Sequence, residues 1–411
     1  MILAQLAVLA TLAACSRDAP RPAPPAKGPY AALVADAIPH VEEAVGLKFK
    51  RPPKVEARSH AEVRQFLQQQ LSDSLAARDL AGKEIAYKLL GLLPDTLDLK
   101  REVEDLLTEQ VVGFYDPQTK VLYVVDSAPP AQLPTVIAHE LVHALQDQYI
   151  NIDSLERIEG ENDRTSAFEA IIEGQAVYGQ LVVATGNRNF IAMIPGGWDR
   201  VREEIRENQA TMPAFANAPM VLQETLLFPY LSGAEFMRRF EQHDPGKEPY
   251  GPLMPTSTKQ ILHPETAYFQ HRDVPTHVTL PAPSGTGRVK YQNTLGEFET
   301  RLFLYQYLDD QPAAVRGAAG WEGDRYEIIQ GPTGARTIAW VTVWDSPVDA
   351  AQFRAMVLEI VARRQKDVPS RVVTVTAPEI QGRPAVIYVD APRGAPTHVV
   401  DPTKVGLALE P

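Results

Sequence analysis

Two histidines and a glutamate in the segment IAHELVHALQDQ, residues 137–148, carry the side chains best suited to chemistry. His139 and His143 are four residues apart, and Glu140 directly follows the first of them. On a helix this spacing places both imidazoles on one face, with Cβ atoms about 5–6 Å apart. Both rings can then reach one metal ion, and the Glu140 carboxylate can reach a water molecule on that ion. The spacing therefore predicts a metal site carried by a helix.

This H-E-x-x-H pattern is the arrangement used by zinc hydrolases. Its flanks are typical of a buried helix, because they are apolar or small: Val136, Ile137, Leu141, Val142, Ala144 and Leu145. A match of five residues also arises by chance, and the pair would then be two histidines on a polar helix face. A metal site needs a third protein ligand, which the rest of the chain has to supply.

Glu173 is the residue that we favour as the third ligand. It lies in SAFEAIIEGQAVYGQ, residues 166–180, among apolar neighbours, where a carboxylate is costly to bury unless it is paired or bound to metal. Glu169, one turn earlier on the same face, is the alternative ligand or a partner of a ligand. Glu159 and Glu161 lie in a polar loop and rank lower. If neither helix acid binds metal, the two form an exposed stripe.

Together these residues resemble a gluzincin-type metallopeptidase, which carries H-E-x-x-H on one helix and a glutamate ligand on the next. More closely, the chain resembles uncharacterised bacterial lipoproteins with a peptidase-like domain. Their pattern G-F-Y-D-P, H-E-L-x-H-A-L-Q-D-Q and E-G-x-A matches residues 113–117, 139–148 and 173–176. A looser match continues through residues 257–265 and 320–326.

The resemblance implies a role for each matching residue. His139, His143 and Glu173 would bind one Zn²⁺ per chain, and Glu140 would act as general base and acid toward the water on the zinc. Residues 121–126 would form the edge strand of the active-site sheet, to which an extended peptide substrate could pair.

The sequence does not identify the residue that orients a metal-binding histidine. Thermolysin-like members place an aspartate one turn after the glutamate ligand, but this chain has Val177 there. Asp147, one turn beyond His143, could take the role, because ligating histidines usually donate their second N–H to an oxygen. Alternatively, Asp147 simply belongs to the exposed end of the helix.

Amide hydrolysis also needs a donor for the oxyanion that develops in the transition state. His263 in ILHPE is our first candidate as a second catalytic residue, because Pro264 favours extended backbone just before it. Tyr178 and Tyr268 follow. For each of the three, taken singly, a structural role is the more common interpretation.

Two parts of the chain must position these groups. We predict an α+β fold: a mainly helical, zincin-like metallopeptidase domain with a small hairpin over residues 30–279, a linker at 280–288, and a smaller α+β domain over 289–411. Hydrophobic periodicity and turn residues predict the elements. The predicted helices cover 30–46, 59–76, 79–93, 98–110, 164–182, 218–241, 293–308 and 347–364. The predicted strands cover 54–58, the hairpin 111–126, 325–330, 337–344, 372–377, 385–390 and 398–401.

The N-terminal residues indicate export. Residues 1–14 have the length and the apolar core of a signal peptide, and LAAC, residues 12–15, resembles a bacterial lipobox. We expect a lipid on Cys15, a proline-rich tether over 15–29, and a place on the bacterial cell envelope facing the periplasm or the exterior. No Lys or Arg precedes the apolar core, and a buried N-terminal helix is the alternative.

The net charge of the chain limits the classes of molecule that it can bind. The chain has 40 basic and 52 acidic residues, a net charge of −12, and no long basic run, which argues against a nucleic-acid partner. We therefore expect a zinc-dependent hydrolase of peptides or proteins. A non-catalytic binding or assembly lipoprotein on the same scaffold is the alternative, and hydrolysis of a cell-wall amide is a third option.

Overall fold

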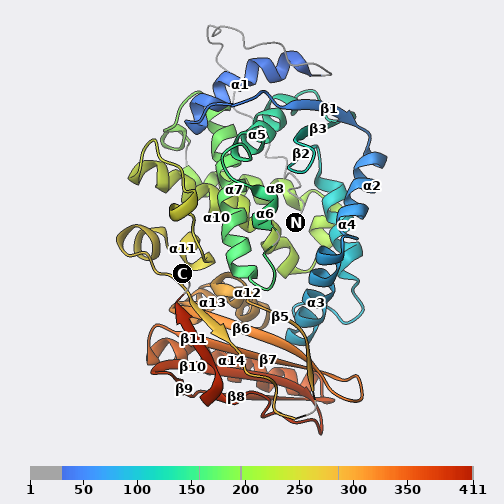
Figure 1. Cartoon of the computed structure of the whole chain (residues 1–411), viewed down its shortest axis with the longest axis vertical. Coiled ribbons are helices and arrows are strands. Elements are labelled where there is room, and N and C mark those ends of the chain that lie inside the picture. The colour runs from blue at the N-terminus through green and yellow to red at the C-terminus, as the bar shows by residue number, and fades with distance from the viewer. Residues whose placement is uncertain (1–29, 157, 195–196, 286, 410–411) are drawn as a thin grey trace.

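The computed structural model describes residues 30–409, apart from 157, 195–196 and 286. The signal peptide, Cys15 and the tether therefore lie outside the described residues. Figure 1 shows a helical part at one end of the molecule and a sheet-rich part at the other. No helix in the described part of the chain is long and apolar enough to cross a membrane.

The first part of the chain builds a small sheet among helices. Its elements are α1 (Ala31–Val45), β1 (Lys54–Arg58), α2 (His60–Gln70), α3 (Ser74–Leu90), α4 (Leu99–Gln110), β2 (Gly113–Asp116), β3 (Val121–Val125) and α5 (Leu133–Gln146). Ser59 begins α2 with a reciprocal cap, in which Ser59 and Glu62 each accept the other's backbone N–H. β2 and β3 pair antiparallel, which confirms the predicted hairpin.

β3 is the central strand of this sheet, whose order is β1-β3-β2. The prediction that residues 121–126 form an edge strand is therefore wrong. β1, which lies more than sixty residues earlier, pairs parallel with the side of β3 that the hairpin leaves open. β2 is the edge strand beside Glu140, because a Cβ built on Gly113 would lie 3.7 Å from Glu140 Cγ.

Two long helices, α7 (Asn162–Thr185) and α10 (Met220–His243), pack against each other at the centre of the helical part. Their backbones touch, since a Cβ built on Gly233 would lie 1.9 Å from the Ala170 carbonyl oxygen. The other elements of this part are α6 (Ile152–Glu156), η1 (Phe190–Met193), α8 (Gly197–Ala210), α9 (Pro213–Asn217), η2 (Gly251–Leu253), α11 (Thr258–Leu262) and a π-helical turn, Pro264–Gln270.

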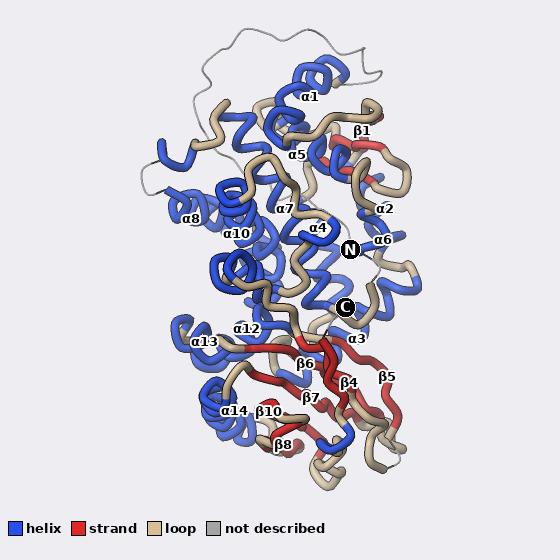
Figure 2. Tube along the Cα trace, turned by 60° about the vertical axis from the view of Figure 1, so that its left-hand side comes forward, coloured by secondary structure: helices blue, strands red, loops and turns tan. Residues whose placement is uncertain are grey.

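The last part of the chain folds into a curled antiparallel sheet with helices on one face, as the strands and helices in Figure 2 show. The main strand order is β5-β6-β7-β10-β8, and β9 pairs with β10. Its elements are β5 (Arg288–Asn293), α12 (Gly296–Leu308), α13 (Gln311–Ala318), β6 (Trp321–Gln330), β7 (Arg336–Trp344), α14 (Pro347–Asp367), β8 (Arg371–Thr376), β9 (Glu379–Ile380), β10 (Arg383–Pro392) and η4 (Pro402–Lys404). The predicted strand at 398–401 is wrong. β11 (Gly406–Leu409) forms instead and pairs with β4 (Thr276–Thr279).

These two parts confirm the α+β class, and they share one hydrophobic core. Its buried residues run from Ala44 in α1 to Tyr388 in β10. β4 lies before the predicted linker at 280–288, yet it pairs with β11 at the other end of the last part. The linker therefore does not separate two cores.

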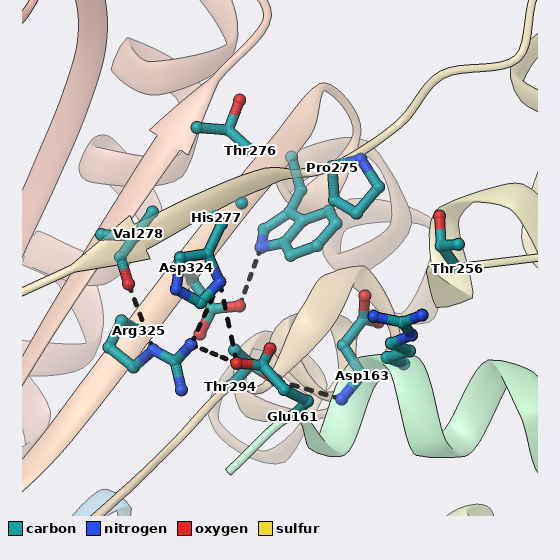
Figure 3. Close-up of a pocket in the computed structure, with 13 residues that line it drawn as sticks. Glu161, Asp163, Thr256, Pro275, Thr276, His277, Val278, Thr294, Asp324 and Arg325 are labelled. Carbon is teal, nitrogen blue, oxygen red and sulfur yellow. Dashed lines mark hydrogen bonds and ion pairs between the residues drawn. The ribbon is translucent and has the colours of Figure 1, made fainter. Parts of the chain in front are cut away.

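Polar contacts also join the two parts, at the pocket shown in Figure 3. Arg325 on β6 donates to the Gly160 carbonyl oxygen and pairs with Glu161, at the N-terminal end of α7. It also donates to the Val278 carbonyl oxygen in β4 at 3.2 Å. The last part of the chain thus holds the start of α7.

Candidate metal centre

α5 carries the two histidines in a buried position. The helix is buried from Val136 to Gln146 and packs against α1, β2 and α7. His139 and His143 lie on one face, and their ring centroids are 4.8 Å apart. Helical spacing alone brings the two imidazoles together, as the sequence predicts.

α7 brings a carboxylate to the same point. Glu173 Oε2 lies 3.2 Å from His139 Nε2 and 3.5 Å from His143 Nε2. One ligand atom from each residue lies within 4.8 Å of the others. These three side chains are therefore positioned as a metal site requires.

Glu169, the alternative ligand, does not join this cluster. Its carboxylate lies in the electrostatic field of Lys83 on α3 and of Tyr230 on α10. Glu169 therefore lies outside the ligand cluster, although it shares Tyr230 with Glu173 as a neighbour.

The buried donor atoms of the cluster are of the kind that bind a metal cation. The buried carboxyl of Glu140 has no side-chain hydrogen-bond partner among the described residues, and His143 Nε2 has only a long contact of 3.5 Å to Glu173 Oε2. Such orphaned groups are rare in folded proteins and call for a ligand. Two imidazoles and a carboxylate form a donor set that suits zinc.

Charge in the cluster is set by burial and by mutual attraction. Burial raises the pKa of Glu140 to about 8, although His143 opposes the shift. Burial would also raise the pKa of Glu173, but attraction to His143 and hydrogen bonding to His139 outweigh it and hold that pKa low. Glu173 therefore contributes a negative charge, whereas Glu140 can exchange a proton near neutral pH.

Two glutamines orient the imidazoles. His139 Nδ1 lies 2.9 Å from Gln180 Oε1, and His143 Nδ1 lies 2.9 Å from Gln146 Oε1. An amide oxygen only accepts hydrogen bonds, so each Nδ1 carries the proton. Each Nε2 therefore faces Glu173, on the side of the ring where a bound metal ion would replace its proton.

Asp147 does not orient His143. Its carboxylate accepts from the Tyr115 hydroxyl at 2.7 Å and pairs with Lys120 at 2.6 Å. The neighbouring residue, Gln146, takes the orienting role instead, because it is the residue that turns toward α7. The interpretation of Asp147 as the histidine partner is wrong.

Tyr230 on α10 is a residue of the centre that the sequence analysis missed. Its buried hydroxyl is hydrogen-bonded to Glu173, and its ring stacks on His139 with centroids 6.4 Å apart. Burial and the charges of Glu173 and Glu140 raise its pKa well above the usual value, so the hydroxyl keeps its proton. No sequence motif marks this tyrosine.

The three oxyanion donors expected from sequence have other partners. His263 Nε2 lies 2.8 Å from Glu297 Oε1 and 2.8 Å from an Arg301 guanidinium nitrogen. The Tyr178 hydroxyl donates to the Arg188 carbonyl oxygen at 3.2 Å, and the Tyr268 hydroxyl donates to the Leu253 carbonyl oxygen. The structure does not bring these residues into the histidine–glutamate cluster.

A second acidic group lies where the two parts of the chain meet. Asp273, Glu322 and Asp345 offer carboxylate oxygens within 4.8 Å of one another. The Lys259 ammonium already pairs with all three, at 2.6, 3.4 and 2.9 Å. We therefore assign this group to contact between the two parts.

Comparison with known proteins covers only the last part of the chain. A family model described as a domain of unknown function (DUF8575) matches residues 286–404. No curated protein and no solved structure shows significant similarity to the chain. His139, His143 and Glu173 all lie outside the matched residues.

Proposed function

We propose that the protein hydrolyses amide bonds of peptides or proteins with one zinc ion held by His139, His143 and Glu173. One observation carries the proposal. Glu140 is fully buried beside these ligands, and its carboxyl has no side-chain hydrogen-bond partner among the described residues. A purely structural metal site has no use for such a carboxyl, whereas hydrolysis needs a group that takes up and releases a proton.

Each residue has a task in this reaction. Zinc supplies a Lewis acid that makes water nucleophilic at neutral pH. Glu140 takes the proton of the attacking water and passes it to the leaving amine. Tyr230 would turn its protonated hydroxyl from Glu173 toward the developing oxyanion. His139, Glu140, His143 and Glu173 are at most 3% exposed, so the reacting groups are kept away from bulk water.

We place this activity on the bacterial cell envelope. The apolar residues 2–14 and the lipobox-like end at Cys15 support export and attachment by a lipid. Intact-mass measurement of membrane-extracted protein tests this placement. A chain that still begins at Met1 and carries no lipid contradicts it.

The first test measures metal and activity together on protein beginning after Cys15. We expect about one zinc per chain by elemental analysis, lost in Glu173→Ala and retained in Glu169→Ala. We expect hydrolysis of fluorescently labelled casein to disappear in Glu140→Gln while zinc remains. A chain that binds no zinc after zinc is supplied contradicts the proposal. Unchanged hydrolysis in Glu140→Gln contradicts the role of Glu140.

A further inference from the structure

The contacts behind His143 continue beyond its first partner. Gln146 accepts from His143 through its amide oxygen, and its amide nitrogen donates to Gln175 Oε1 at 2.9 Å and to the Ile172 carbonyl oxygen at 3.0 Å. Both glutamines are buried, with 0% and 3% of their surface exposed. Gln175 lies on α7, two residues after Glu173, so this contact joins the two helices that carry the ligands.

The chain of contacts then leaves the helices. The Gln175 amide nitrogen donates to Glu248, and the Tyr250 hydroxyl donates to Gln175 Oε1. Both residues lie in the segment between α10 and η2, where Glu248 is partly exposed. We call the series His143, Gln146, Gln175 and Glu248 the amide relay.

The hydrogen bonds of the amide relay all run in one direction, from donor to acceptor. Gln175 turns its nitrogen to Glu248, so its oxygen faces Gln146 and Tyr250. Gln146 must then present its nitrogen to Gln175 and its oxygen to His143. An imidazole nitrogen that faces an amide oxygen has to be the donor. Burial raises the pKa of Glu248 to about 8, and a carboxyl oxygen can accept from Gln175 in either protonation state.

The histidine beside it lacks such a relay. Gln180 accepts from His139 Nδ1, but its own amide nitrogen has no hydrogen-bond partner among the described residues. Rotation of the Gln180 amide is therefore resisted by one contact only. Rotation of the Gln146 amide would set its oxygen against the oxygens of Gln175 and Ile172. Rotation of the Gln175 amide would set its nitrogen against that of Gln146 and its oxygen against Glu248.

We propose that Gln146, Gln175 and Glu248 are positioning residues, which hold the proton of His143 on Nδ1 and keep its Nε2 turned toward Glu173. The proposal rests on the metal centre proposed above and names residues outside its ligands. It also connects a segment at the surface with a buried ligand, since Glu248 orients Gln175, and Gln175 and the Ile172 carbonyl oxygen together orient Gln146.

Zinc affinity, measured by competition with a chelator, tests the relay. Gln146→Leu is expected to weaken zinc binding about 10–100-fold, the usual cost of losing a partner of a ligating histidine. Gln175→Leu and Glu248→Leu are expected to weaken it about tenfold. The double variant of Gln146 and Gln175 should bind as weakly as Gln146→Leu alone, because the relay is already cut. Gln148→Leu is the control, since Gln148 bonds to Lys50 and Arg51.

A structural role alone would not move the proton of the imidazole. In ¹⁵N-histidine NMR spectra we expect His143 to be protonated on Nδ1 in the wild type and in Gln148→Leu, and to show both tautomers in Gln146→Leu. Gln146→Glu, which still accepts from Nδ1, should restore most of the zinc affinity lost in Gln146→Leu and serves if the leucine variant does not fold.

Two results overturn the relay but not the metal centre. The first is wild-type zinc affinity in both Gln175→Leu and Glu248→Leu. The second is a double variant whose loss of zinc affinity equals the product of the two single losses. If the wild type binds no zinc, the proposed function fails, and the spectra of metal-free protein decide about the relay. A His143 ring in that protein that is protonated on Nε2 and deprotonated on Nδ1 overturns it.

Discussion

Tyr230 places a hydroxyl among the charged groups of the metal centre, where it is hydrogen-bonded to Glu173. Tyr230→Phe removes only this hydroxyl. We expect kcat to fall about 10²–10³-fold, the usual cost of losing one donor to an oxyanion, while one zinc per chain remains. Tyr178→Phe is the matched control, because its hydroxyl donates to the Arg188 carbonyl oxygen. Loss of zinc in Tyr230→Phe would instead assign Tyr230 to holding Glu173.

At the residue scale, the sequence predicts the groups whose positions follow from helical spacing. His139, Glu140 and His143 share one helix, so their arrangement is local. Gln180 lies seven residues after Glu173 and hence on the same face of α7, a spacing that could have marked it. Tyr230 could not be found this way, because its place depends on how α10 packs against α7.

At the scale of elements, the crossing of α7 and α10 depends on two glycines. A Cβ on Gly174 would lie 2.2 Å from the Gly233 backbone, and a Cβ on Gly233 would lie 1.9 Å from the Ala170 carbonyl oxygen. Gly233→Ala must therefore push the helices apart, which typically costs about 1–3 kcal/mol. We expect a lower unfolding midpoint and weaker zinc binding, since Tyr230 and Glu173 flank this crossing.

Gly331→Ala is the control for this experiment. A Cβ on Gly331 would meet its nearest neighbour, the Ala335 carbonyl oxygen, at 3.6 Å, an ordinary contact. Wild-type midpoint and zinc affinity in Gly233→Ala would show that the crossing does not position the centre.

Element boundaries follow from local sequence, whereas partners of elements do not. The hairpin over 111–126 and helix α14 were predictable from turn residues and from the Ser346 cap. The place of β3 at the centre of its sheet was not, because it depends on β1, which is remote in sequence. β4 and β11 are separated in the sequence by the whole last part of the chain, so their pairing could not be predicted either.

At the scale of the molecule, the two parts are joined through a buried carboxyl. Glu299 on α12 accepts from the Tyr87 hydroxyl on α3 at 2.8 Å and from the Asn162 side-chain amide on α7 at 2.7 Å. Both bonds go to one oxygen, and the other, Oε2, has no hydrogen-bond partner among the described residues. Burial raises the pKa of this carboxyl to about 7, against the opposing attraction of Lys83.

Glu299 should therefore make the stability of the whole molecule depend on pH. Between the unfolded pKa and about 7, the folded chain keeps a proton that the unfolded chain has lost, so stability falls as pH rises through this window. Glu299→Gln keeps both hydrogen bonds and cannot ionise. We expect it to be more stable than the wild type at pH 8, by on the order of 2 kcal/mol, and close to it at pH 4.5. Thermal unfolding at the two pH values measures the difference, with Glu359→Gln as an exposed control on α14. An equal midpoint difference at both pH values would mean that Glu299 is not the group that titrates, and that the joint between the two parts owes its strength to packing alone.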